Sequence, residues 1–300
     1  MLAGVQPAGN CSIHTRGDTV RDMQEKFYRD PQCLEVPHRY AHLNLHILAD
    51  LAMYHLLARM SALSTKSLEF RDLMRLLYTM YMGHVMSREL YTRDGRMTTR
   101  MCPVLTEIGF DPSCALLQSN ALFDDTVPCV SVGIARAGNL PSSVCFEVLS
   151  RIVGWGHMRL DVMSGERRPS ETGPGVEGTT IAGIKVGGSV EGAVVLFPDP
   201  MCATGGSLVE AIHSYLAAAE GTPRKVIAMP LIITPEAVRR LARELPYVTV
   251  YALRLDRGVS PLEVFDMIPG ADRRESGLTP THYIVPGLGG AGELLSNAEH

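Results

Sequence analysis

The sequence has 300 residues, of which 46% are hydrophobic and 20% are charged, and its formal net charge is −4. This is the composition of an ordinary soluble globular protein, long enough for one large domain or two modest ones. The small negative charge and the lack of a long basic run argue against a nucleic-acid-binding protein and favour a small-molecule partner.

The sequence shows neither a secretory signal nor a membrane-spanning segment. The first residues lack the basic segment and apolar core of a secretory signal, and no apolar run approaches the roughly 20 residues that span a bilayer. We therefore expect a cytoplasmic protein without membrane contact. The seven cysteines are scattered and include no CxxC pair. This favours reduced, mostly buried thiols over a disulfide framework or a zinc site.

The N-terminal part divides into two stretches. Residues 1–36 are polar and rich in turn formers, so we expect a loosely held extension, followed by one domain over residues 37–300. From about His38 to Leu90, apolar residues recur at three- and four-residue spacing, which predicts an N-terminal helical region.

Three histidines in this region have the spacing of neighbours on a helix. His38, His42 and His46 are each four residues apart, and two of them could share a metal ion. All three would span about 12 Å of helix, too far for one ion, so a third ligand would have to come from elsewhere. The simpler interpretation is histidines on one helix face.

In the second half, short apolar runs alternate with helical patterns. We predict strands at 130–134, 157–163, 193–197, 226–233, 248–253 and 283–285, with helices at 142–152, at 207–219 and from Thr234. Residues 165–192 are rich in glycine and predict a long loop or flap with one hairpin. This alternation predicts an α/β fold with a mostly parallel sheet and helices on both faces.

The segment PDPMCATGGSLVEAI, residues 198–212, places an acid and a run of small residues between a strand and a helix. Ligands collect at the carboxyl ends of parallel strands, and the first N–H groups of a helix attract anions. The hydroxyls of Thr204 and Ser207 add donors, so the loop can hold phosphate oxygens without a lysine. Because no Lys stands beside the second glycine, the nucleotide P-loop is excluded. The alternative is a plain strand–turn–helix with a serine cap.

A second glycine-rich segment, YIVPGLGGAGELL, covers residues 283–295. Its glycines match the dinucleotide-binding fingerprint in form, but only eight residues follow Gly292, too few for the required βαβ unit. A glycine-rich loop after a strand can instead offer backbone N–H and C=O groups to the edge of a planar ligand.

Together these segments resemble the uracil phosphoribosyltransferase family. Residues 199–207, DPMCATGGS, resemble its phosphoribosyl pyrophosphate loop, with Cys202 where Leu is usual, and residues 283–289, YIVPGLG, resemble its base-binding loop. Residues 134–138, IARAG, are similar to its pyrophosphate segment, residues 251–258, YALRLDRG, to the preceding strand and turn, and parts of 57–73 to its N-terminal helices. The resemblance covers, with gaps, residues 40–296.

The resemblance implies transfer of a phosphoribosyl group from phosphoribosyl pyrophosphate to a nucleobase, most often uracil, which yields UMP and pyrophosphate in pyrimidine salvage. Asp199 and Arg136 would be the catalytic residues, facing the ribose hydroxyls and the pyrophosphate. Mg²⁺ would arrive on the pyrophosphate, without metal ligands from the chain. Residues 165–192 would cover the site, and the N-terminal helices would form a homodimer or a higher homo-oligomer.

The same resemblance implies two sets of ligand contacts. The phosphoribosyl pyrophosphate contacts are Arg136, Asp199, Pro200, Met201, Cys202, Ala203, Thr204, Gly205, Gly206 and Ser207. The base contacts are Tyr283, Ile284, Gly289, Gly290 and Ala291.

The chain also departs from the family. Gly290 stands where the family has an Asp that contacts the phosphoribosyl group, and Met60 and Ser61 replace an acidic and a basic residue. The family's second pyrophosphate arginine has three candidates here: Arg159, Arg167 and Arg168. These departures leave open a different heterocyclic base, a non-catalytic sensor of phosphoribosyl pyrophosphate or a nucleotide, and an unrelated α/β enzyme.

Overall fold

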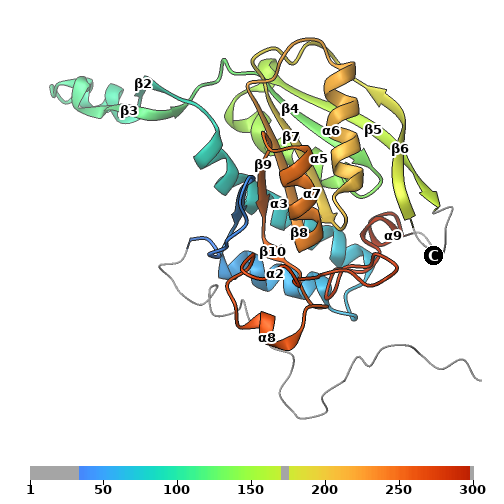
Figure 1. Ribbon diagram of the computed structural model, residues 1–300. Helices are drawn as coiled ribbons and strands as arrows, with labels where there is room; N and C mark the ends of the chain where they lie inside the picture. Colours follow the sequence, from blue (N-terminus) through green and yellow to red (C-terminus); the bar gives the residue numbers. More distant parts are fainter. Residues whose placement is uncertain (1–33, 170–175, 298–300) are drawn as a thin grey trace, which may run out of the picture.

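The centre of the protein is a mostly parallel β-sheet, seen in a computed structural model that describes residues 34–169 and 176–297 (Figure 1). Every pair of neighbouring strands is parallel except β5 and β6, which are antiparallel, and β10 (Arg254–Leu255) pairs with β8. The predicted α/β class is confirmed. The strand order is β1 (Asn44–Ile47), β9 (Thr249–Ala252), β8 (Lys225–Ile233), β7 (Val194–Cys202), β4 (Cys129–Ala135), β5 (Met158–Pro169) and β6 (Val176–Lys185).

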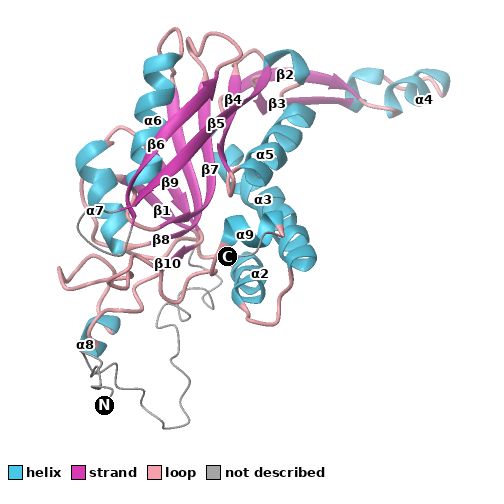
Figure 2. Ribbon diagram, turned by 90° about the vertical axis from the view of Figure 1, so that its right-hand side faces the viewer, coloured by secondary structure: helices cyan, strands magenta, loops and turns pink. Residues whose placement is uncertain are grey.

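Helices cover both faces of this sheet (Figure 2). On β7, Val194 and Leu196 point into the core shared with α2, α3 and α5, whereas Val195 and Phe197 point into the core shared with α6 and α7. A strand buried on both faces is apolar at successive positions, which is why the central strands read as continuous apolar runs. The helices are α2 (Leu51–Ser61), α3 (Ser67–Glu89), α5 (Asn139–Ile152), α6 (Gly206–Ala218) and α7 (Pro235–Glu244).

The N-terminal helical region is present, but it begins later than predicted. The prediction of helix from His38 was wrong, because residues 44–47 form an edge strand paired with β9, and the first helix starts at Leu51 behind an Asp50 cap. Leu45 and Ile47 alternate into the core, and β9 supplies the backbone partners that a strand needs.

The three histidines therefore share no helix face. His46 lies on β1 and stacks on Tyr251 of β9 with ring centroids 4.6 Å apart, and His38 binds the carbonyl of Leu45 at 2.9 Å. Within the described ranges, no group of three or more His, Cys, Asp or Glu side chains is arranged to hold a metal ion.

A two-stranded arm projects from the body and was not predicted from the sequence (Figures 1 and 2). It consists of β2 (Thr92–Thr98) and β3 (Leu116–Phe123), which pair antiparallel, with α4 (Met101–Glu107) and the 3₁₀ turn η1 (Pro112–Ala115) between them. A second 3₁₀ turn, η2 (Trp155–His157), joins α5 to β5.

Three other expectations can be compared with the structure. For residues 165–192 the predicted hairpin is formed by β5 and β6, but β5 continues to Pro169 and β6 begins at Val176, so the described part is not one long loop. The strand predicted at 283–285 is not formed, because that segment is a loop with a single bridge between Leu278 and Ile284. The end of the predicted N-terminal extension is ordered, since Val36 is buried and its N–H donates to Ile47, while residues 1–33 lie outside the described residues.

The described cysteines are free thiols: Cys102, Cys129, Cys145 and Cys202 are buried, and Cys114 is exposed. Across the described part of the chain, no helix is both long and apolar enough to cross a membrane.

Candidate functional site

Three loops that are far apart in the sequence meet beyond the carboxyl ends of β4 and β7. Gly138 follows β4, and a Cβ placed on it would lie 3.1 Å from the carbonyl oxygen of Pro198 on β7. A Cβ on Gly292 would touch that of Ala137 at 4.0 Å, and Arg136 Nη2 donates to Glu293 Oε1 at 3.3 Å. The structure therefore brings the predicted pyrophosphate, phosphate and base segments together.

The loop between β7 and α6 is hydrogen-bonded to Thr234, the cap of α7. Its hydroxyl donates to the carbonyl of Ala203 at 2.6 Å and accepts from the N–H of Ala237 at 3.1 Å. The sequence predicted Thr234 only as a helix cap. Gly205 turns the chain with φ at +76°, a conformation that favours glycine. One residue thus fixes both the cap of α7 and the phosphate loop.

Residues 199–207, predicted as a loop, include the end of β7 and the start of α6, and their side chains divide into two groups. Pro200 and Cys202 are buried, and burial, the largest influence, raises the pKa of the Cys202 thiol, so this side chain belongs to the core. Asp199 and Thr204 are half-buried and Ser207 is exposed. Asp199 accepts from the N–H of Met201 at 3.2 Å, and Thr204 accepts from that of Gly206 at 3.3 Å.

The base segment packs on a buried ion pair, Arg254 and Asp256, for which the sequence predicted no role. Arg254 and Asp256 are 5% and 1% exposed and join in two hydrogen bonds of 2.5 and 2.9 Å. Asp256 accepts from the N–H of Gly287 at 2.7 Å, and Arg254 donates to the carbonyl of Gly287 at 3.1 Å. Their spacing of two residues in a strand-like segment was the available signal, because such residues face the same side.

The predicted base-contact residues differ in exposure. Tyr283 is 71% exposed, Ile284 and Gly290 are half-buried, and Gly289 is exposed. Ala291 is buried and begins α9 (Ala291–Ser296), and its N–H donates to the carbonyl of Gly289 at 3.0 Å. Two backbone groups expected to meet a base are therefore bonded to each other.

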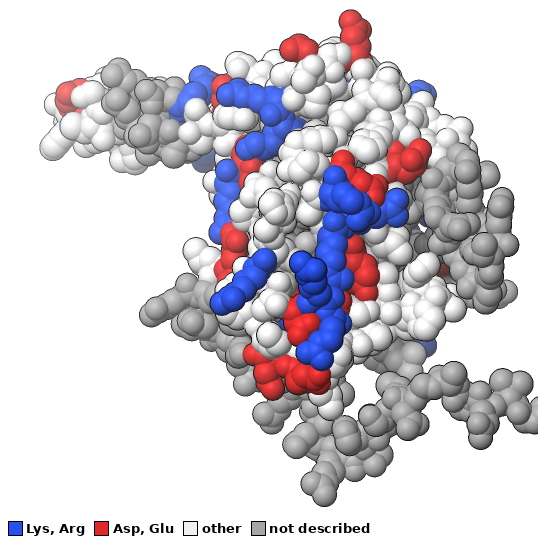
Figure 3. Space-filling model, in the orientation of Figure 1, with Lys and Arg blue, Asp and Glu red and all other residues white. Residues whose placement is uncertain are grey.

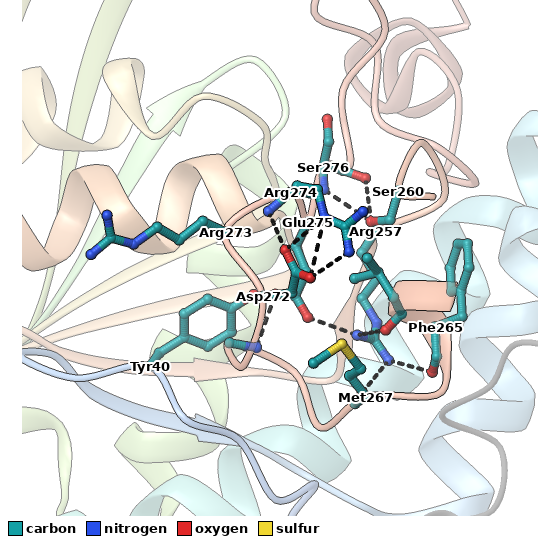
Figure 4. Close-up of polar contacts among 12 residues, drawn as sticks. Tyr40, Arg257, Ser260, Phe265, Met267, Asp272, Arg273, Arg274, Glu275 and Ser276 are labelled. Carbon is teal, nitrogen blue, oxygen red and sulfur yellow. Dashed lines mark hydrogen bonds and ion pairs between the residues drawn. The ribbon is translucent and has the colours of Figure 1, made fainter. Parts of the chain in front are cut away.

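The chain makes a long excursion, residues 257–282, between β10 and the base segment, and its centre is Glu275 (Figure 4). This buried carboxylate accepts from Arg257 Nη1 at 2.7 Å, from the Tyr40 hydroxyl at 2.5 Å and from the N–H of Gly270 at 2.9 Å. Burial, followed by the bond to Glu275, raises the pKa of Tyr40. The excursion is thereby tied to the N-terminal segment.

Arg257 completes this anchor. Its Nη nitrogens also donate to the carbonyls of Val264, Phe265 and Met267, around the short helix α8 (Leu262–Phe265), at 3.0 to 3.2 Å. The excursion then returns to the base segment, where the N–H of Val285 donates to Gly277 at 2.9 Å. Residues 257–282 therefore support the base segment from this side.

The register of β5 separates the three arginine candidates for the pyrophosphate. Arg159 lies opposite Val130 near the start of β4, at the edge away from the loops, and is paired with Asp161 at 3.0 Å. Ser164 is opposite Ala135, the last residue of β4, so Arg167 and Arg168 lie beyond the carboxyl end of β4. Arg159 is thereby removed as a candidate.

Comparison with known proteins points to one family. The family model for uracil phosphoribosyltransferase matches residues 174–272. The uracil phosphoribosyltransferase of Shouchella clausii is 36% identical over 112 residues, which is 37% of this chain and 43% of that protein. That of Clostridium botulinum is 26% identical over 241 residues, 80% of this chain and 92% of that protein. The chain is a divergent relative of the uracil phosphoribosyltransferases.

The extent of this similarity is uneven. The uracil phosphoribosyltransferase of Thermococcus sibiricus is 30% identical over 107 residues, and the match spans 36% of its length. In three dimensions, the AQ2163 protein of Aquifex aeolicus superposes with a TM-score of 0.61 at 20% identity, over 84% of this chain and 97% of that one. This last likeness concerns the fold.

At Gly290, where the sequence departs from the uracil phosphoribosyltransferases, the structure shows what surrounds the missing carboxylate. Gly290 precedes α9 and brings no side chain to the place where the loops meet. The carboxylate of this segment is instead that of Glu293, which is 20% exposed and paired with Arg136. Glu293 belongs to the quoted segment 283–295, but nothing in its sequence spacing predicted the contact with Arg136.

Proposed function

We propose that this protein transfers a phosphoribosyl group from phosphoribosyl pyrophosphate to a nucleobase and releases pyrophosphate, with uracil as the first base to test. The observation that supports this proposal is that the Arg136–Gly138 segment meets Pro198, just before Asp199–Ser207, and Gly292 and Glu293, just after Tyr283–Ala291. Each segment resembles the family's loop for a different part of the two substrates.

The role of each residue follows from its place. The backbone N–H groups after Ala203 and the hydroxyls of Thr204 and Ser207 would bind the 5-phosphate at the start of α6. Asp199, at the end of β7, would face the ribose hydroxyls. Arg136 would meet the pyrophosphate, together with Arg167 or Arg168 on the β5–β6 hairpin.

The reaction separates charge, and these residues would stabilise the separated charges. As the bond from the ribose C1 carbon to pyrophosphate breaks, positive charge grows on the sugar and negative charge on the leaving group. Mg²⁺ bound to the pyrophosphate, as part of that substrate, would neutralise the leaving group together with Arg136. The remaining contribution of the protein is to hold the two substrates in line.

A panel of nucleobases tests the proposal. The full-length protein is incubated with Mg²⁺, phosphoribosyl pyrophosphate and one base at a time, and both pyrophosphate and nucleotide are quantified. We expect equal amounts of the two products with uracil or another planar base, and a strong loss of both in Asp199→Asn. Asp125→Asn, an exposed residue paired with Arg93 on the arm, is the matched control. A panel without product would contradict the transferase.

A second candidate is a non-catalytic sensor of phosphoribosyl pyrophosphate or a nucleotide. Gly290 favours it, because the family's carboxylate is missing, and so does the bond that occupies the Gly289 and Ala291 backbone groups. The same panel separates the candidates, because a sensor would bind phosphoribosyl pyrophosphate, as measured by calorimetry, and release no pyrophosphate.

We also infer that residues 37–300 act as one domain in a homo-oligomer formed through the N-terminal helices. Leu63 and Leu68, in the turn between α2 and α3 and at the start of α3, are 99% and 74% exposed, which supports this contact. Light scattering of the wild-type chain and of a Leu63→Ser, Leu68→Ser variant tests it. A monomeric wild-type chain would contradict the inference.

A further inference from the structure

Helix α7 places a guanidinium against the first residue of α6. Arg240 Nη1 lies 2.7 Å, and its Cζ 3.4 Å, from the position that a Cβ on Gly206 would occupy. The Thr204 hydroxyl lies 3.4 Å from the same point. The glycine at 206 therefore leaves room for Arg240 beside a hydroxyl of the phosphate loop.

The other arginines of α7 are directed elsewhere. Arg239 donates to the carbonyls of Arg273 and Glu275, and Arg243 is 68% exposed and paired with Glu244. Figure 3 shows that basic and acidic side chains are interleaved on the face drawn, so this region is not a uniformly basic surface. Within α7, the contact with the loop is particular to Arg240.

The position of Arg240 is electrostatically unfavourable for the protein by itself. The first turn of α6 carries partial positive charge, which repels a cation. Arg240 reaches Glu244 only through its Nε, at 3.2 to 3.3 Å. Among residues 34–169 and 176–297, neither Nη nitrogen of Arg240 donates a hydrogen bond. Local rules are broken in this way chiefly at functional sites, where a bound ligand compensates.

The field of Arg240 also extends into the loop. Although burial, the larger effect, raises the pKa of the Cys202 thiol, the charge of Arg240 acts to lower it. An anion at the start of α6, next to Gly206, would lie in the field of the same charge.

We propose that Arg240 is a phosphate-binding residue of this site and supplies, from α7, the positive charge that the loop of residues 199–207 lacks in its own sequence. The proposal rests on the proposed function, since the ligand is the 5-phosphate of a ribose. The Nη edge of the guanidinium would donate to phosphate oxygens held by the Thr204 hydroxyl and the α6 amides.

The experiment compares the binding of ribose 5-phosphate to four full-length proteins by calorimetry at low salt: the wild type, Arg240→Gln, Arg240→Lys and Arg243→Gln. We expect Arg240→Gln to weaken binding by about tenfold or more, because a charged contact is lost. Arg240→Lys retains the charge and should lose less. Arg243→Gln, which removes the other partner of Glu244, should stay within about twofold of the wild type.

The outcomes distinguish this inference from the proposed function. If the wild type binds and Arg240→Gln binds within twofold of it, the role of Arg240 is refuted and the proposed function stands. If Arg240→Gln and Arg243→Gln weaken binding equally, the role of Arg240 is also refuted. Binding would then depend only on the total charge of α7. A wild type that does not bind ribose 5-phosphate would overturn both. Urea denaturation of each variant checks that it is folded.

Discussion

Arg136 and Glu293 lie side by side at 3.3 Å although 157 residues separate them in the chain. This pair connects the predicted pyrophosphate segment to α9, directly after the predicted base segment. Because the Arg136 side chain is 61% exposed, the pair is weakly held, and an incoming pyrophosphate would compete with Glu293 for the guanidinium.

We therefore expect Glu293→Gln to bind pyrophosphate more tightly than the wild type, by about two- to fivefold. Arg136→Gln should weaken the same binding by about tenfold or more, because a charged contact is lost. Calorimetry with Mg²⁺-pyrophosphate measures both effects. Weaker binding by Glu293→Gln would mean that the carboxylate orients Arg136 and does not compete with the ligand.

Gly138 sets the separation between the loop after β4 and strand β7, which carry the predicted pyrophosphate and phosphate contacts. A Cβ at this position would lie 2.8 Å from the carbonyl oxygen of Ile134 and 3.1 Å from that of Pro198, and neither backbone group can move freely. We expect Gly138→Ala to lower the free energy of unfolding by about 1–3 kcal/mol and to weaken binding of phosphoribosyl pyrophosphate.

The control for this prediction is Gly83→Ala in α3, where nothing lies within 4 Å of an added Cβ. Alanine in an exposed helix position should raise stability by about 0.5–1 kcal/mol. Urea denaturation compares the two variants. Equal effects of the two substitutions would show that the packing at Gly138 does not matter.

The buried pair under the base segment should be important for stability. In Asp256→Asn, Arg254 would remain buried without its counter-charge, which costs about 3–5 kcal/mol. The N–H of Gly287 would also lose a charged acceptor. We expect a large fall in the urea midpoint, whereas Asp125→Asn, in the exposed pair with Arg93, should leave it unchanged. A small effect of Asp256→Asn would mean that water replaces the carboxylate.

Restoring the family's acid tests what Gly290 does. Asp at this position would bring a carboxylate to the place where the loops meet, so we expect Gly290→Asp to increase uracil-dependent pyrophosphate release by about 10- to 150-fold if the contact acts in the transition state. Gly156→Asp, at an exposed glycine with nothing within 4 Å of an added Cβ and no positive φ, is the control for added charge. Unchanged release together with tight ligand binding would favour the sensor.

Stability should fall at alkaline pH because of the buried thiols. Burial raises the pKa of Cys129 to about 12 and also raises that of Cys145. The unfolded chain releases these protons near the ordinary thiol pKa of about 8.5, and the folded chain keeps them. The free energy of unfolding therefore decreases as the pH rises above about 8.5, by up to about 1.4 kcal/mol per pH unit for each thiol.

Urea denaturation between pH 7.5 and 10.5 measures this slope. Cys145→Ala should reduce the slope of unfolding free energy against pH by the amount that corresponds to about one proton. Cys114→Ala, which removes an exposed thiol, should leave the slope unchanged. Identical slopes for the wild type and Cys145→Ala would show that this thiol ionises in the folded protein as well.

The sequence by itself determined the α/β alternation and the turn from β7 into α6 within residues 199–207. Buried strands such as residues 226–233 are recognisable because both of their faces pack. The turn within residues 199–207 is recognisable because small residues follow an apolar run and precede a helical pattern. Caps such as Thr234 are local as well, since their hydrogen bonds stay within a few residues.

Only the tertiary structure decided the rest, because the relevant contacts join distant residues. Residues 44–47 became a strand because the edge of β9 was free to pair with them, against a helical spacing of apolar residues. Arg159 was separated from Arg167 and Arg168 by the register of β5 on β4. Arg240 lies against Gly206 because α7 packs beside α6, and no spacing in the sequence predicts this contact. Side chains from different elements come together only when the cores on both faces of the sheet form.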